Sequence, residues 1–156
     1  PADIKLTENS FLTMDFGAKY NGYCSDMTRT VVLGKADDEM KHLYNTVLEA
    51  QKAGIAAAHG GAKGCDVDKA ARNVIDNAGY KGLFSHSLGH SLGIEIHENP
   101  RFAPRFENIC PKDSIITVEP GIYIPGKYGV RIEDMVLLTD GGCRDLTHSP
   151  KELIEL

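Results

Sequence analysis

The Asn21-Gly22 dipeptide is the sequence feature that most constrains the fold, because Asn-Gly between apolar runs is the strongest short-range signal for a β-hairpin. Residues 11–16 alternate between apolar and polar character, which predicts one strand. Residues 23–33 end in a β-branched run, which predicts its partner. The chain is therefore expected to contain a long antiparallel hairpin near its start.

Two aspartates share one face of this predicted hairpin. With a two-residue loop, Asp15 lies opposite Thr28, and Asp26 is its diagonal neighbour, so the Cβ atoms are about 7–8 Å apart. Two carboxylates at this separation can bind one cation or two adjacent cations. The alternative is a pair of solvated acids on an edge hairpin. The apolar neighbours Met14, Phe16, Met27 and Val31 predict that this region is buried. Burial of two carboxylates without a cation is energetically unfavourable, which counts against the alternative.

Two helices are expected after the hairpin. Asp37 or Asp38 can cap the first, which has an apolar stripe to about residue 59 and stops at Gly60-Gly61. Asp66 is expected to cap the second, and Gly79 to end it. Strands are predicted again over residues 114–118 and 130–138, so the pattern is α+β.

Composition narrows the class of protein. The chain has 156 residues, of which 42% are apolar and 25% charged, an ordinary balance for one globular domain. A net charge of −5 disfavours a nucleic-acid partner. No apolar run approaches the ~20 residues of a membrane helix, and residues 1–5 lack a signal-peptide core. The four cysteines form no CxxC pair, which predicts reduced thiols and a cytoplasmic location.

Three histidines, His86, His90 and His97, fall within a glycine-rich segment that lets the backbone approach a ligand closely. No glutamate directly follows His86 or His90, so the segment is not an HExxH motif. A single histidine is more often structural than a ligand. Three among apolar neighbours favour a functional role more than one would, and the structural alternative stays open.

Two glutamates, Glu119 and Glu133, lie in or beside apolar strands, where a core strand would not place an acid. The structural alternative is a solvent-facing position or a salt bridge with Arg131. Taken together, four carboxylates and one or more imidazoles suit Mn²⁺, Co²⁺, Fe²⁺ or Zn²⁺. Four carboxylate charges balance two divalent ions, and a pair of metals about 3.5–4 Å apart is a known arrangement for hydrolysis.

Five motifs together identify a family. They are MDFGA at 14–18, GYCSDMTRT at 22–30, GHSLG at 89–93 followed by His97-Glu98, TVEPGIY at 117–123 and GVRIED at 129–134. Their order and residues resemble the pita-bread metallopeptidases, and most closely the Xaa-Pro peptidases, prolidase and aminopeptidase P. The resemblance extends from about residue 11 to residue 156.

The resemblance implies an α+β pita-bread (creatinase/aminopeptidase) fold, with a curved antiparallel sheet and helices on its outer face. Residues 1–156 then correspond to the C-terminal portion of a metallopeptidase catalytic domain, without its first helix pair. Part of the sheet should lack helical cover and expose apolar side chains. The N-terminal remainder of the enzyme, or a homo-oligomer partner, is therefore expected.

The resemblance also implies a set of site residues. Five would bind two metal ions, with Mn²⁺ most expected: Asp15, Asp26, His90, Glu119 and Glu133. Glu119 would also shuttle the proton of the bridging water. His86 and His97 would hold the substrate and stabilise the tetrahedral intermediate, and Arg131 would lie beside Glu133 at the substrate site. The expected activity is hydrolysis of Xaa-Pro peptide bonds by a metal-bridging hydroxide.

Three other functions are compatible with the same fold. Methionine aminopeptidases share the five ligands, but the segments around Asp26 and from Glu119 to Arg131 are more similar to the Xaa-Pro enzymes. A non-catalytic peptide- or protein-binding module is a second alternative, and a metal-free, creatinase-like hydrolase is a third. Both of these predict lost ligands, whereas all five are present here.

Overall fold

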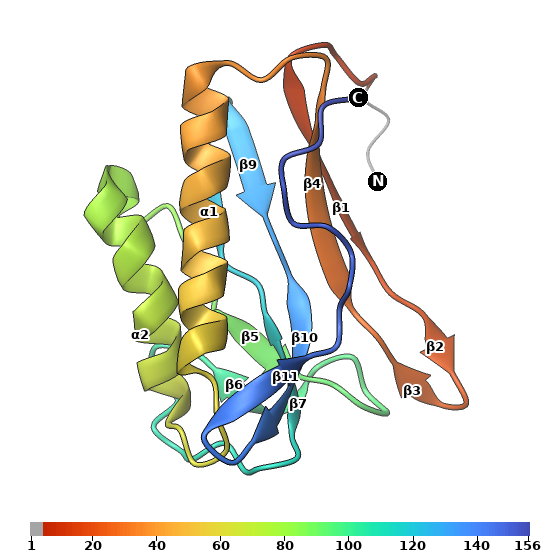
Figure 1. Cartoon of the computed structure of the whole chain (residues 1–156), viewed down its shortest axis with the longest axis vertical. Helices are drawn as coiled ribbons and strands as arrows, with labels where there is room; N and C mark the ends of the chain where they lie inside the picture. Colours follow the sequence, from red (N-terminus) through yellow and green to blue (C-terminus); the bar gives the residue numbers. More distant parts are fainter. Residues whose placement is uncertain (1–4) are drawn as a thin grey trace.

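The computed structural model describes residues 5–156, in which two helices pack against antiparallel strands (Figure 1). Residues 1–4, which carry most of the segment examined for a signal peptide, lie outside the described part. In chain order the elements are β1 (Ser10–Phe16), β2 (Lys19–Tyr20), β3 (Tyr23–Cys24), β4 (Met27–Leu33), α1 (Asp38–Ala57), α2 (Gly64–Ile75), the π-helical turn η1 (Asp76–Tyr80), β5 (Gly89–Ser91), β6 (Glu98–Phe102), β7 (Ile115–Val118), β8 (Gly121–Ile124), β9 (Tyr128–Arg131), β10 (Asp134–Thr139) and β11 (Gly142–Asp145).

The predicted hairpin is present with the predicted register. β1 pairs with β4, so Asp15 lies opposite Thr28, and β2 pairs with β3 on either side of the turn. Asn21 and Gly22 have φ angles of 49° and 87°, the left-handed conformation that a two-residue hairpin turn requires. The prediction that the hairpin is largely buried is wrong towards its tip, where Phe16 is 54% exposed.

The first helix begins as predicted, and the second does not. The Asp37 carboxylate accepts a hydrogen bond from the Met40 amide, which caps α1. The prediction that Asp66 caps the second helix is wrong, because α2 already begins at Gly64 and Asp66 lies in its first turn. There its charge favours the helix N-terminus without serving as the cap.

Five strands form one antiparallel sheet in the order β11-β10-β7-β5-β6. The single strand predicted over residues 130–138 is instead two strands, because the chain leaves its pairing with β8 and joins β7. Glu133 lies at this transition and forms an isolated bridge with Thr28 of β4. The change of partner strand therefore places Glu133 against β4 of the N-terminal hairpin.

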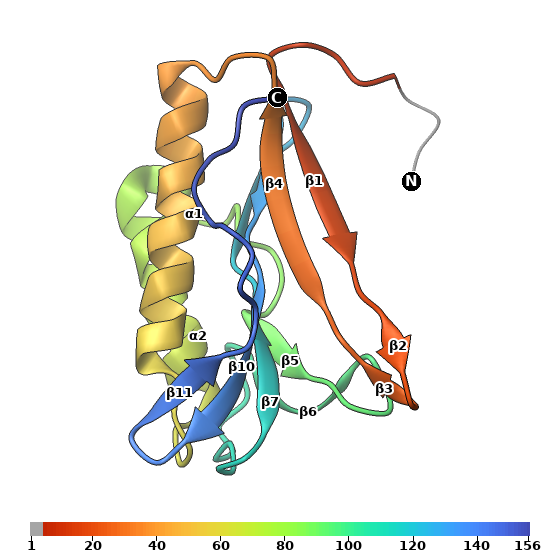
Figure 2. The ribbon, with the colours of Figure 1, turned by 45° about the vertical axis from the view of Figure 1, so that its right-hand side comes forward.

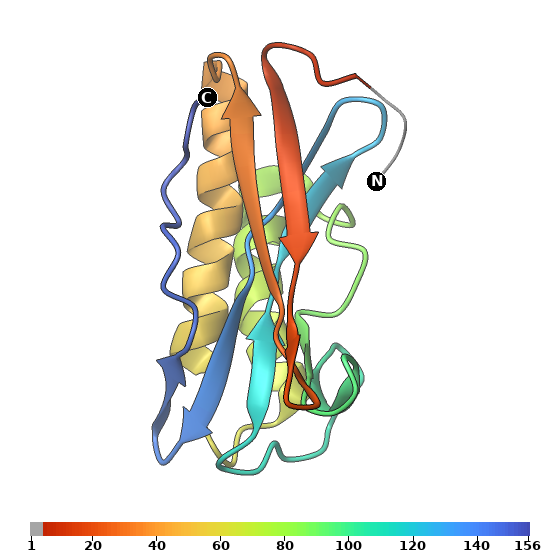
Figure 3. The same ribbon diagram turned by 90° about the vertical axis from the view of Figure 1, so that its right-hand side faces the viewer.

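The helices cover one side of the strands, and the long β1/β4 hairpin lies on the other (Figure 2). The main core contains buried residues of α1, α2, β7 and β10, such as Val47, Ala71, Ile116 and Val136. The segment after β11 runs beside β4 in Figure 1, and the chain ends near the upper end of that strand (Figure 3). There the backbone of Val32 exchanges hydrogen bonds with Ile154 and Leu156.

Apolar side chains are exposed at the end of the hairpin. Tyr20 is 79% and Tyr23 63% exposed, and both flank the turn. Among residues 5–156, no helix combines the length and apolar character needed to cross a bilayer. The four cysteines are free thiols.

Candidate metal centre

One cavity of about 290 Å³ brings all eight predicted site residues together. Its walls come from the hairpin, from the segment around β5, and from the ends of β7, β9 and β10. The residues that line it are Asp15, Asp26, His86, Ser87, His90, His97, Arg101, Glu119, Arg131 and Glu133. Asp15 and Glu133, which are 118 positions apart in the sequence, thus line the same cavity.

Backbone pairing sets the position of the buried side of this cavity. The amide of Glu119 donates to the Leu88 carbonyl at 2.8 Å, and the amide of Glu133 donates to the Thr28 carbonyl at 3.1 Å. Gly89 allows β5 to approach β7, since a Cβ at this position would lie 1.8 Å from the Thr117 carbonyl oxygen. The close approach places His90 beside the end of β7.

His90 presents a bare ring nitrogen to the carboxylates. Its Nδ1 lies 3.1 Å from the Ser91 carbonyl oxygen, which can only accept, so Nδ1 carries the proton in the neutral ring. Nε2 then offers a lone pair, at 3.3 Å from Glu119 Oε1 and 3.8 Å from Asp26 Oδ2. Three acceptor atoms that face one another require a cation or a proton between them.

Glu133 completes this group. Ligand atoms of Asp26, His90 and Glu133 all lie within 4.8 Å of one another. The Glu133 side chain is 1% exposed, and Thr28 Oγ1 donates to its Oε2 at 2.5 Å. Thr117 Oγ1 likewise donates to Glu119 Oε1 at 2.9 Å. A carboxylate-rich donor set with one imidazole, oriented by hydroxyl groups, fits a divalent cation.

Asp15 lies apart from this group because it pairs with Arg131. The Arg131 guanidinium forms an ion pair with the Asp15 carboxylate, donates to Thr28 Oγ1 at 3.1 Å, and donates to the Tyr123 hydroxyl at 3.1 Å. The salt bridge considered for Glu119 or Glu133 is therefore made by Asp15. The Asp15 side chain remains 53% exposed.

A hydrogen-bonded chain connects Arg131 to His86. The Tyr123 hydroxyl lies 2.9 Å from His86 Nε2, and His86 Nδ1 lies 2.8 Å from the Ser87 carbonyl oxygen. Nδ1 therefore donates to the carbonyl, and Nε2 of the neutral ring accepts from Tyr123. The chain fixes the orientation of a polar wall on one side of the cavity.

Burial controls the ionisation of the cluster. Desolvation raises the pKa of Glu119 and of Glu133 above the ordinary range of a glutamate, and the mutual repulsion of the two carboxylates adds to the shift of Glu133. The pKa of Asp26 is raised first by burial and then by Asp15. Burial lowers the pKa of His90, which keeps its Nε2 lone pair available. The electrostatics favour a cation among the acids.

Two exposed residues also line the cavity, one predicted and one not. The predicted residue is His97, whose ring centre lies 4.3 Å from that of His90. The residue that was not predicted is Arg101. Thr28, Thr117 and Tyr123 were likewise not assigned roles, although all three lie inside the quoted motifs. Motif membership was the signal that could have identified them.

Known proteins resemble this chain over nearly its whole length. The model of metallopeptidase family M24 matches residues 1–140. A protein named Xaa-Pro dipeptidase from Pyrococcus furiosus is 44% identical over 153 residues, which is 98% of this chain. An uncharacterized peptidase of Bacillus subtilis is 49% identical over 156 residues.

Solved structures show the same fold. The prolidase from Thermococcus sibiricus superimposes with a TM-score of 0.97 at 44% identity, covering 100% of this chain and 42% of that one. The X-Pro aminopeptidase from Thermotoga maritima gives 0.96 at 41% identity, covering 99% and 44%. The chain spans 44% of the length of the Bacillus and Pyrococcus furiosus relatives. The fold is thus that of the pita-bread peptidases, and the chain belongs to metallopeptidase family M24.

Proposed function

We propose that this chain forms the metal-binding catalytic part of an Xaa-Pro peptidase, a prolidase or aminopeptidase P. The observation that carries the proposal is the convergence of Asp26, His90 and Glu133 ligand atoms within 4.8 Å, in a cavity that Asp15 and Glu119 also line. The Xaa-Pro preference rests on relatives named Xaa-Pro dipeptidase and prolidase. The free thiols fit the cytoplasmic location proposed for the enzyme.

Two divalent ions, with Mn²⁺ proposed as the native metal, would be held by Asp15, Asp26, His90, Glu119 and Glu133. When bound, they would activate a water molecule and polarise the scissile carbonyl. Four carboxylates supply the charge that balances two such ions. The raised pKa values of Asp26, Glu119 and Glu133 support this assignment, because they reflect a cluster that is unfavourable when ionised without a cation.

The remaining side chains have roles that suit their positions. Glu119 lies at the edge of the cluster, 3.3 Å from His90, and is proposed to carry a proton from the attacking water to the prolyl nitrogen. The exposed ring of His97 is proposed to donate to the developing oxyanion. His86 and Arg131, joined through Tyr123, are proposed to hold the substrate on the opposite wall.

Activity measurements test the proposal directly. The protein is expected to hydrolyse a dipeptide with proline in second position when Mn²⁺ is present, and to cleave the matching dipeptide with alanine far more slowly. Asp26→Asn should abolish the reaction, because the amide has no charge to offer a cation. The exposed Lys52→Gln is the matched control and should retain full activity. Unchanged turnover in Asp26→Asn, or binding of the peptide without cleavage, would refute the assignment.

A further inference from the structure

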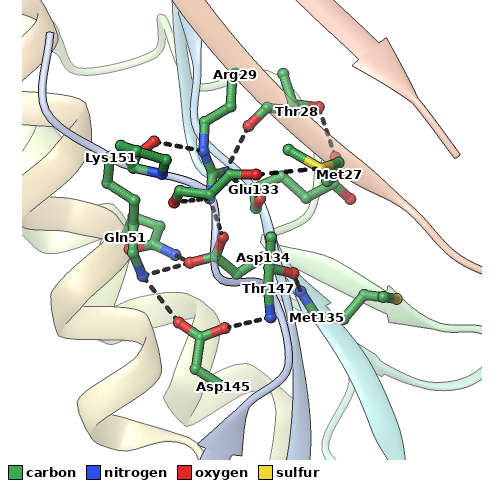
Figure 4. A network of polar contacts seen from close by, with 12 residues as sticks. Met27, Thr28, Arg29, Gln51, Glu133, Asp134, Met135, Asp145, Thr147 and Lys151 are labelled. Carbon is green, nitrogen blue, oxygen red and sulfur yellow. Dashed lines mark hydrogen bonds and ion pairs between the residues drawn. The ribbon is translucent and has the colours of Figure 1, made fainter.

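A buried arginine lies directly behind Glu133, outside the set of residues that line the cavity (Figure 4). Arg29 is 7% exposed, and its guanidinium donates five hydrogen bonds, as many as it has N–H groups. Nε donates to the Pro150 carbonyl at 2.9 Å, Nη1 donates to the carbonyls of Thr28 at 2.9 Å and Glu133 at 2.6 Å, and Nη2 donates to Asp134 Oδ1 at 2.7 Å and to the Ser149 carbonyl at 2.9 Å.

Two consecutive residues of β4 hold Glu133 from opposite sides. Thr28 and Arg29 point to opposite faces of the strand, as neighbours in a strand must. Thr28 accepts from the Glu133 amide and donates to its carboxylate, whereas Arg29 donates to its carbonyl. The amide, the carbonyl and the carboxylate of Glu133 are therefore all tied to β4, at the point where the chain passes between β9 and β10.

The C-terminal segment completes the arrangement. Asp134, which is fully buried, accepts from Arg29 and from Gln51 Nε2 at 2.7 Å, and it forms an ion pair with Lys151. Lys151 also lies 2.9 Å from Asp145 of β11. Arg29 thus connects the backbone at Glu133 to the carbonyls of Ser149 and Pro150. Lys151 reaches the neighbouring Asp134, as the close-up shows (Figure 4).

We propose that Arg29 is a positioning residue for Glu133, and that residues 149–151 form part of the support of the metal centre. The inference rests on the proposed function, because the positioning of the Glu133 carboxylate matters only if that carboxylate binds a metal. A buried ion pair is by itself weak evidence for stability, because apolar residues of similar volume often serve as well. The planar fork of Arg29 satisfies carbonyls from three segments at once, which a lysine cannot do.

Titration with Co²⁺ tests this role, because the visible absorption of the bound ion reports its coordination as well as its affinity. Arg29→Lys should lower Co²⁺ affinity by about tenfold or more, in the range seen when outer-shell partners of metal ligands are replaced, and should change the absorption bands. Lys151→Met should produce a smaller change of the same kind. Val47→Ala, a core substitution outside the cavity, is the control: it should lose stability in urea but keep the wild-type affinity and spectrum.

The possible outcomes separate the two proposals. Wild-type affinity and an unchanged spectrum in Arg29→Lys would overturn the positioning role. If Arg29→Lys does not fold, Lys151→Met decides by the same criterion, since its side chain is 25% exposed and its replacement is tolerable. A wild-type protein that takes up no Co²⁺ would instead overturn the proposed function, and the positioning role with it.

Discussion

On the sheet side of the cavity, His90 and the two glutamates are held by backbone pairing and by hydroxyl donors, whereas on the hairpin side Asp15 remains 53% exposed and pairs with Arg131. Asp26 is intermediate, with a side chain that is 13% exposed. The sheet side is therefore preorganised for a cation. Asp15 must give up or share its arginine partner before it can bind one.

The two sides of the cavity differ in how unfavourable their charged carboxylates are when no metal is bound. Burying Glu133 and Glu119 is unfavourable while they are ionised, and a bound cation would relieve this cost. On the exposed side the Arg131 guanidinium already neutralises Asp15. We therefore expect most of the dependence on metal to come from the sheet side.

The largest expected effect comes from comparing Glu133→Gln with Asp15→Asn. Removing the buried carboxylate should lower Mn²⁺ affinity by at least about 100-fold, the upper end of what outer-shell changes produce. Removing the exposed, Arg131-paired carboxylate should cost less. Calorimetric titration of both variants measures the difference. Equal losses, or a greater loss in Asp15→Asn, would break the proposed contrast between the two sides.

Metal binding should stabilise the folded protein. Mn²⁺ at 100 times its dissociation constant contributes about 2.7 kcal/mol to the free energy of unfolding. For a chain of this size that corresponds to a rise in Tm of about 5–11 °C. Differential scanning calorimetry with and without Mn²⁺ checks the value, and Mg²⁺ at the same ionic strength is the control for screening. No shift with Mn²⁺, Co²⁺ or Zn²⁺ would mean that the site does not form.

Without metal, stability should depend on pH with a sign set by the glutamates. Because the pKa of Glu119 and of Glu133 is raised in the folded state, the folded protein binds more protons than the unfolded chain above the ordinary glutamate pKa of about 4.3. Their contribution to stability therefore falls as pH rises towards the raised values, by at most about 1.4 kcal/mol per group and pH unit. His86 and His90, whose pKa values are lowered by burial, act in the opposite direction below the ordinary histidine pKa of about 6.5.

Urea unfolding in chelator between pH 4 and pH 8 isolates this contribution when wild type and Glu133→Gln are compared. The variant should gain stability relative to wild type as pH rises. A difference in stability that does not change with pH would show that Glu133 is not destabilised by burial.

The smallest expected effect concerns a single hydroxyl group. Thr28→Val removes the donor to the Glu133 carboxylate and should weaken Mn²⁺ binding by about tenfold. Thr30→Val is the matched control, because Thr30 lies on the same face of β4 and its hydroxyl donates to the Arg131 carbonyl at 2.8 Å. Equal affinities in the two variants would indicate that the hydroxyl does not orient the carboxylate.

Local patterns predicted the hairpin and its register, although the strand predicted over residues 23–33 is divided into β3 and β4. Asn21-Gly22 favours a two-residue turn, and the turn determines the register that puts Asp15 opposite Thr28. The same local reasoning failed for the strand over residues 130–138. Apolar residues recur along the whole segment, on both sides of Arg131 and of Glu133-Asp134. The chain nevertheless changes partner strands at Glu133, and this depends on tertiary contacts with Thr28.

The arrangement of the site depends on long-range contacts that local patterns cannot give. The contact of Arg131 with Asp15 requires β9 to lie beside the hairpin, and the contact of Tyr123 with His86 requires β8 to meet the segment before β5. The apolar neighbours of Asp15 suggested burial, yet Phe16 is exposed because that end of the hairpin extends beyond the core. The residue set came from the motifs, whereas the contrast between its two sides required the structure.

The most direct test of this account is a crystal structure of the protein grown with Mn²⁺, with anomalous diffraction used to locate the ions. Two ions about 3.5–4 Å apart are expected in the cavity, with ligands from Asp15, Asp26, His90, Glu119 and Glu133. An empty cavity at saturating Mn²⁺, or ions bound elsewhere while these five side chains keep their present contacts, would contradict it.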